Sequence, residues 1–189
     1  MPTRVLTAQL GSASGLGSLK NPDVRKTLAL LGAFCMFLST IEFMIPKPMP
    51  FMRLGLANLP LMMALDIFPF PTFVALIGIK VLGQAIVTGT LFSYIFLFSL
   101  VGTTLAALSM YFLRRTLRER VSFIGVGAMG AMVSTISQMA LAWLFLLGNA
   151  ARFIAPPFFA AGLITGIALG VFCEIFTRRS QWYAARRVR

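Results

Sequence analysis

The chain has 189 residues, of which 58% are hydrophobic and 12% are charged, and it carries a formal charge of +12 without any histidine. Apolar runs of about 18 or more residues recur along it, which is the length that crosses a bilayer core, whereas a soluble domain alternates apolar and polar faces. These properties exclude a soluble globular protein and predict an all-α integral membrane protein.

The apolar runs predict one bundle of six transmembrane helices. Asn21-Pro22 is a suitable helix start before the first run, and GTLFS has to turn sharply between the third and fourth. A polar tail at 1–25, which we expect to be disordered, precedes a membrane domain at 26–178 and a basic interfacial tail at 179–189. The six spans are placed at residues 27–45, 55–68, 72–90, 91–113, 121–147 and 156–176.

The basic residues predict one orientation. Most of the 17 lysines and arginines lie in the N-terminal tail, in the loop RRTLRER and in the C-terminal tail RRSQWYAARRVR. Such clusters stay in the cytoplasm under the positive-inside rule, and six spans return the chain to its starting side. We therefore expect both tails to be cytoplasmic and interpret Trp182 and Tyr183 as interfacial anchors on the bilayer. No folded basic surface remains for nucleic acid.

The second span is too short to cross the membrane alone, because its helix would rise about 21 Å against a core of about 30 Å. The segment PKPMPFMRLGLAN, residues 46–58, leads into it. We expect residues 46–53 to dip into the outer part of the bundle, since irregular backbone survives at this depth only when buried in protein or beside a cavity. An ordinary external loop beside a thinned bilayer is the alternative.

Polar side chains within or next to the spans are the candidate binding residues, because charged groups at membrane depth face a cavity or a partner. Lys80 lies near the middle of the third span, with Gln84 on the same helix face. Either Lys80 lines an outward-opening pocket, or Glu42 or Asp66 neutralises it as a packing pair. The candidate substrate-binding residues are Glu42, Arg53, Asn58, Lys80, Gln84 and Gln138.

Two of these candidates have a second interpretation. Arg53 could bind a ligand anion with its bidentate fork or could lie at the membrane interface. Asn58 could bind a ligand or could satisfy backbone groups freed by the nearby prolines. Glu174, near the end of the sixth span, is expected to pair with Arg178 four residues on.

Small residues predict close helix contacts. Ala29 and Ala33 form an AxxxA pair in the first span, which could face another subunit. Gly162, Gly166 and Gly170 repeat every four residues in the sixth span, and we interpret this stripe as internal packing.

The sequence offers no catalytic or cofactor-binding constellation. It has no GxxxxGK[ST] phosphate loop and no histidine for a metal site or a nucleophile's base. Only two aspartates are present, Asp23 and Asp66, so the carboxylate cluster that holds magnesium against a diphosphate is missing. Cys35 and Cys173 both lie in apolar runs and are expected to be packing residues. We therefore expect no cofactor, no metal and no catalysis by this chain alone.

Three segments carry a resemblance to a known family: PKPMPFMRLGLAN, VLGQAIVTGTLFSYIFLFSLVG at 81–102 and AGLITGIALG at 161–170. Over residues 28–172 the chain resembles the Gx transporter family, whose members are often labelled heptaprenyl diphosphate synthase component I. The family is similar to the substrate-binding S components of energy-coupling factor (ECF) transporters, six-helix proteins of prokaryotic cell membranes.

The resemblance implies roles for particular residues. Ala29 and Ala33 would contact a transmembrane coupling subunit, which works with ATPases. Residues 46–53 would form a lid over an outward-facing ligand pocket. The fifth span departs from the family's His-Asn-x-Gly-Gln pattern, because STISQ at 134–138 keeps only the glutamine. The implied lid residues are Pro46, Pro48, Pro50 and Phe51.

Three functions therefore stay open. The first is a binding subunit for uptake of a small, anionic or planar, vitamin-like compound. The second is a membrane component of an isoprenoid, quinone or flavin-linked redox pathway that holds a lipid-like ligand. The third is a purely structural assembly subunit, in which Lys80 pairs with a carboxylate and no cavity exists.

Overall fold

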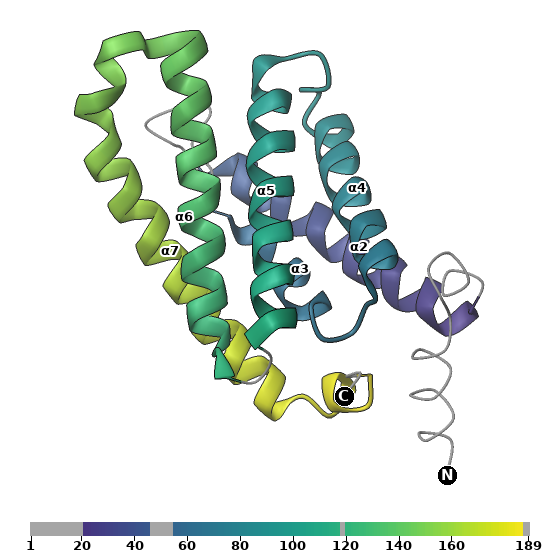
Figure 1. Ribbon diagram of the computed structural model, residues 1–189. Coiled ribbons are helices and arrows are strands. Elements are labelled where there is room, and N and C mark those ends of the chain that lie inside the picture. Colours follow the sequence, from purple (N-terminus) through teal and green to yellow (C-terminus); the bar gives the residue numbers. More distant parts are fainter. Residues whose placement is uncertain (1–20, 46–54, 118–119, 187–189) are drawn as a thin grey trace.

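The computed structural model describes residues 21–45, 55–117 and 120–186, and over these ranges every regular element is a helix (Figure 1). Short helices and helical turns interrupt or link the main helices: η2 (Leu56–Asn58), α3 (Leu59–Ala64), η4 (Trp143–Leu147), η5 (Gly148–Ala150) and α8 (Gln181–Ala184). The main helices are α2 (Pro22–Met44), α4 (Phe70–Val87), α5 (Tyr94–Leu117), α6 (Phe123–Ala142) and α7 (Ala151–Arg179).

Five helices in the described ranges are long and apolar enough to cross a membrane, with α6 continuing through η4 to Leu147. Their mean hydropathies lie between 1.6 and 2.0. They correspond to the first, third, fourth, fifth and sixth predicted spans, so the all-helical membrane fold is confirmed. The second predicted span is different, because it holds only the η2 turn and the six-residue helix α3, all of whose residues are buried.

The helix starts follow local sequence signals. Asn21 accepts a hydrogen bond from the Asp23 amide at 3.0 Å and caps α2, as the sequence predicts. The prediction for the sixth span was wrong at its start: α7 begins at Ala151, and Pro156 and Pro157 lie inside it. Proline is typical of a first helical turn, but membrane helices also tolerate it further along when neighbouring groups satisfy the freed backbone.

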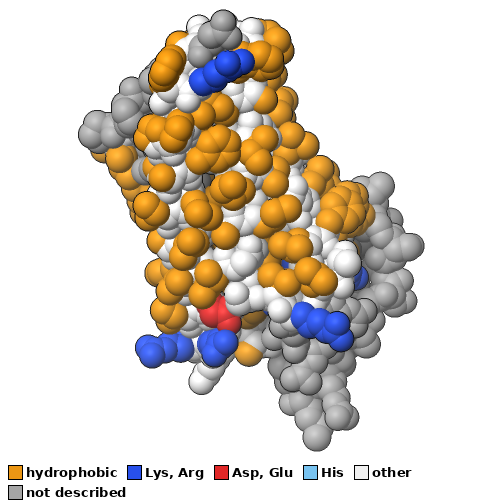
Figure 2. Space-filling model, turned by 60° about the vertical axis from the view of Figure 1, so that its left-hand side comes forward, with side chains coloured by type: hydrophobic (Ala, Val, Ile, Leu, Met, Phe, Trp, Pro, Cys, Tyr) orange, Lys and Arg blue, Asp and Glu red, His pale blue; other side chains and the backbone are white. Residues whose placement is uncertain are grey.

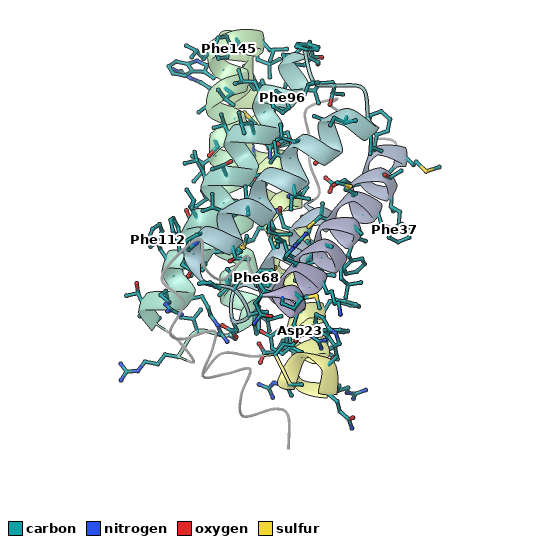
Figure 3. The ribbon with its side chains drawn as sticks, turned by 90° about the vertical axis from the view of Figure 1, so that its right-hand side faces the viewer. Asp23, Phe37, Phe68, Phe96, Phe112 and Phe145 are labelled. Atoms are coloured by element: carbon teal, nitrogen blue, oxygen red, sulfur yellow. The ribbon has the colours of Figure 1, made fainter. Side chains whose placement is uncertain are left out.

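Helices α5, α6 and α7 lie side by side, whereas α2 crosses behind α4 and α5 at a steep angle (Figure 1). Helix α7 lies outermost, against α6, and α3 lies within the bundle. Figure 3 shows Phe37 pointing away from α2, where its side chain is exposed, while Phe68 beyond α3 lies in the buried core. The short helix is therefore enclosed by the long ones.

The surface separates apolar sides from a charged end. Hydrophobic side chains cover the face seen in Figure 2, and Lys and Arg side chains gather at its lower end, with a smaller basic area at the upper end. We call the lower end of the molecule the basic end. Helices α5 and α7 end there, and α6 begins there. Its exposed arginines include Arg115, Arg120, Arg178 and Arg179.

The glycine stripe of α7 packs against α6, which confirms its interpretation as internal packing. A β-carbon on Gly170 would lie 2.6 Å from the Ile124 Cα and 2.7 Å from the Phe123 carbonyl oxygen. A β-carbon on Gly166 would lie 2.7 Å from the Gly127 carbonyl oxygen. These atoms belong to the backbone and cannot turn aside, so the two helices need glycine to approach this closely.

We expect Gly166→Ala to lower the free energy of unfolding by about 1–3 kcal/mol, because the added methyl group forces α6 and α7 apart. The matched control is Gly78→Ala in α4, where a β-carbon meets nothing within 4 Å. Thermal unfolding in detergent should show a clearly lower midpoint for Gly166→Ala alone. Equal midpoints for the two variants would contradict the close α6–α7 contact.

Candidate functional site

The chain enters α3 through a tight turn that glycine makes possible. Gly55 adopts a left-handed conformation with φ of 82°, which other residues rarely adopt. The η2 turn follows, and Pro60 occupies the first turn of α3, where its missing N–H removes no helical hydrogen bond. From Gly55 the segment leads directly into the buried helix.

Glu42 of α2 holds this turn in place. Its carboxylate accepts hydrogen bonds from the Gly55 amide at 3.1 Å and from the Ala57 amide at 3.5 Å. These amides precede a helix and have no partner within it, so an acceptor from another element stabilises the buried turn. A carboxylate also suits the positive end of the helix dipole. Glu42, predicted as a binding residue, thus supports the segment that carries Asn58.

Lys80 joins three elements at the centre of the bundle. Its side chain lies on α4 and is only 2% exposed. The Nζ atom donates hydrogen bonds to Asn58 Oδ1, just before α3, and to Thr103 Oγ1 of α5 at 3.5 Å. Gln84, one turn further along α4, is also buried. The structure therefore brings Lys80 and Asn58 together, as two members of the predicted site.

Gln138 of α6 lies against α5, and its side chain is 1% exposed. Its Nε2 donates to Ser134 Oγ at 2.8 Å, while its Oε1 has no hydrogen-bond partner among the described residues. A β-carbon on Gly102 would lie 3.2 Å from Nε2, so the glycine gives the amide its room. The structure thus places Gln138, a predicted binding residue, in the interior of the bundle.

A small cleft lies where the turn before α3 meets α5, α6 and α7. It encloses about 20 Å³, enough for about one water molecule. Asn58 and Ser134 line the cleft directly. Lys80 and Gln138 do not line it, but Lys80 is hydrogen-bonded to Asn58 and Gln138 to Ser134. We call this space the central cleft; its other lining residues are Gly55, Met62, Met110, Gly127, Gly130, Ala131, Thr135, Gly162, Thr165, Gly166 and Leu169.

The hydroxyl residues of the central cleft were not predicted as site residues. Thr135 Oγ1 donates to the Ala131 carbonyl oxygen at 2.8 Å, and Thr165 Oγ1 to the Ala161 carbonyl oxygen at 3.0 Å. The sequence carries a signal for one of them, Ser134, because it stands four residues before Gln138 and therefore shares its helix face.

Several predicted residues lie elsewhere. The lid residues Pro46, Pro48, Pro50 and Phe51, together with Arg53, fall outside the described residues. Ala29 and Ala33 lie on the exposed side of α2, pointing away from the bundle. They share that side with the exposed Leu30 and Phe37.

The basic end is closed by a network that the sequence did not predict. Arg114 donates to both carboxylate oxygens of Asp66, at 2.9 and 2.8 Å, and also to the Val121 carbonyl oxygen. Tyr183 OH donates to Asp66 Oδ2 at 3.1 Å. Because Asp66 lies just beyond α3, the network ties that end of the short helix to α5 and α8.

Two interpretations at the basic end were therefore wrong. Arg114 was assigned to an anchoring loop, but it is buried in the last turn of α5 and lies 4.4 Å above the Phe123 ring. Tyr183 was assigned to the interface, but it is 2% exposed and packs in the core. Both side chains contact Asp66, which lies 48 residues from Arg114 and 117 residues from Tyr183 in the sequence. The predicted Glu174–Arg178 pair is confirmed at 2.9 Å, and Glu174 also accepts from the Phe123 amide.

The chain matches the family described as heptaprenyl diphosphate synthase component I over residues 31–176. The matched range includes α3 to α6 and most of α2 and α7. Comparisons with curated proteins and with solved structures give no match. Within the described part of the chain, no group of three or more His, Cys, Asp or Glu side chains could hold a metal ion.

We expect Tyr183→Phe to lower the free energy of unfolding by about 1–3 kcal/mol, because the buried Asp66 carboxylate loses one charge-assisted hydrogen bond while the ring is kept. Tyr94→Phe is the matched control, since Tyr94 is half exposed at the opposite end. Thermal unfolding of both variants in detergent measures the difference. An unchanged midpoint for Tyr183→Phe would support the interfacial-anchor interpretation instead.

Proposed function

The chain belongs to the family described as heptaprenyl diphosphate synthase component I, and from this premise we propose that it is a non-catalytic, substrate-binding membrane subunit. In this proposal it works like the S component of an ECF transporter. It binds a small, anionic or planar, vitamin-like compound for uptake, and a partner complex supplies the energy.

The observation that carries the proposal is the polar centre that α3 brings into an apolar bundle. Asn58, backed by Lys80, stands on one side of the central cleft, and Ser134, Thr135 and Thr165 stand on the other. Polar groups at membrane depth are costly and are typical of ligand pathways. Here they gather at one place, where four elements meet. A purely structural subunit would not need this concentration of polar groups around a cleft.

We propose that the ligand reaches the central cleft from the external side. The basic end is cytoplasmic under the positive-inside rule, so both tails lie in the cytoplasm. Access from that end is blocked, because Asp66, Arg114 and Tyr183 join the end of α3 to α5 and α8. The cleft must widen to admit a vitamin-sized compound, and movement of the segment before α3 is the simplest way.

The family description favours one alternative, a membrane component of an isoprenoid, quinone or flavin-linked redox pathway that holds a lipid-like ligand. Such a ligand would enter between helices from the bilayer and would need a long apolar cavity. The central cleft is small and four polar side chains line it, which favours the uptake function over this alternative.

Native mass spectrometry of the protein purified gently from its own membranes tests the proposed function. We expect a retained small polar compound together with a partner complex that carries ATPase subunits. A retained quinone or polyprenyl lipid without such a partner would support the alternative. The same spectra would identify the ligand by its mass.

We also propose that Ala29 and Ala33 form the docking face for the coupling subunit. Both lie on the exposed side of α2, and small residues let another helix approach closely. The large exposed side chains of Leu30 and Phe37 flank them and offer apolar contact area.

Replacing both Ala29 and Ala33 with leucine should abolish co-purification of the coupling subunit and leave ligand retention unchanged, because the added side chains block the approach of a helix. The matched control replaces Ala160 and Ala168 with leucine, since both alanines lie on the exposed side of α7. Affinity purification followed by native mass spectrometry measures both quantities. Normal co-purification of the α2 variant would exclude α2 as the docking face.

A further inference from the structure

The carboxamide of Asn58 is held in one orientation by Lys80. A lysine ammonium group can only donate hydrogen bonds, so the atom that it contacts must be the amide oxygen and not the amide nitrogen. The NH₂ group then points the other way, toward Gly55: a β-carbon on Gly55 would lie 3.2 Å from Asn58 Nδ2. Gly55 and Asn58 both line the central cleft. The donor end of the amide therefore lies beside Gly55, in the wall of the cleft.

The surroundings prevent the amide from turning over. Lys80 is buried between α4 and α5 and also donates to Thr103, so its ammonium group stays in place. A flipped amide would bring two hydrogen-bond donors together in a buried place, which is costly. Glu42 fixes the turn from the other side through the Gly55 amide. Gly55 itself has no side chain that could cover the NH₂ group.

The opposite wall has the complementary character. Thr135 and Thr165 donate their hydroxyl protons to carbonyl oxygens of their own helices, so each presents an oxygen lone pair to any neighbour in the cleft. The cleft thus has a donor on the α3 side and acceptors on the α6 and α7 side. A ligand that fits must carry its own acceptor toward Asn58.

We propose that Asn58 is a specificity-determining residue and Lys80 its positioning residue, so that the central cleft selects ligands with a carbonyl or carboxylate oxygen facing Asn58. This inference rests on the proposed function, because it assumes that the cleft binds a ligand. It goes further by naming the chemical group that the ligand presents. A ligand that has only a hydrogen-bond donor facing Asn58, such as an amine, is rejected because its donor would meet the NH₂ donor of Asn58.

Three fragment probes that share a phenyl ring test the selection: acetophenone, with a neutral carbonyl; benzoate, with a carboxylate; and benzylamine, with a donor only. Saturation-transfer NMR on the full chain in detergent measures their relative affinities. We expect the wild type to prefer acetophenone or benzoate over benzylamine by at least about tenfold. The ratio of acetophenone to benzoate separates recognition of a carbonyl from attraction of a negative charge.

Asn58→Asp keeps the shape and the contact with Lys80 but replaces the NH₂ donor with an acceptor. We expect this variant to lose the preference for acetophenone and benzoate, whereas Lys80→Met, which frees the amide to turn, should reduce it. Asn21→Asp is the matched control, because aspartate caps α2 equally well and lies outside the cleft. Its probe affinities should equal those of the wild type.

The outcomes separate the two levels of the proposal. A wild type that binds acceptor probes with the same preference as Asn58→Asp overturns the inference and leaves the proposed function standing. A wild type that binds benzylamine as well as acetophenone also overturns it. A wild type that binds no probe and retains no compound from its own membranes overturns both. Thermal unfolding of each variant confirms that it is folded before affinities are compared.

Discussion

The structure depends on how the six-residue helix α3 is held inside a membrane bundle. A helix of this length is unstable alone, and unsatisfied backbone groups at membrane depth are costly. The protein meets both demands with side chains from other elements. Glu42 satisfies the amides of the entering turn, and Asp66 beyond the exit is held by Arg114 and Tyr183. Both contacts involve charged groups with little exposure to solvent, so α3 has one well-defined place among the long helices.

The same anchoring creates the central cleft. Because α3 is short, the chain before it can bring a glycine turn and an asparagine to the middle of the bundle, where a full-length span would present only a helix surface. Lys80 orients Asn58, and the close α6–α7 pair supplies the hydroxyl groups opposite. The network at the basic end closes one side of the molecule. This arrangement is the basis of the proposed substrate-binding function.

The sequence predicts the architecture better than the site. Hydrophobic length and helix signals are local, so the sequence alone predicts five of the spans, the Asn21 cap and the Glu174–Arg178 pair. Its motifs also identify the family, which the family match confirms. The partners of Asp66 do not follow, since Tyr183 lies 117 residues away and the positive-inside rule treats every arginine alike. The polar residues Lys80 and Asn58 were predicted as candidates, but their contact depends on how α3 and α4 pack.

Hydrogen–deuterium exchange of the backbone amides of α3 tests the central claim most directly, with Glu42→Gln compared with the wild type. The account predicts that α3 in the wild type exchanges as slowly as α6, although an isolated helix of six residues would exchange rapidly. In Glu42→Gln the exchange of residues 55–64 should accelerate, while α6 and α7 stay protected. Rapid exchange of α3 in the wild type, or no change in the variant, would contradict an internally anchored helix and the cleft built on it.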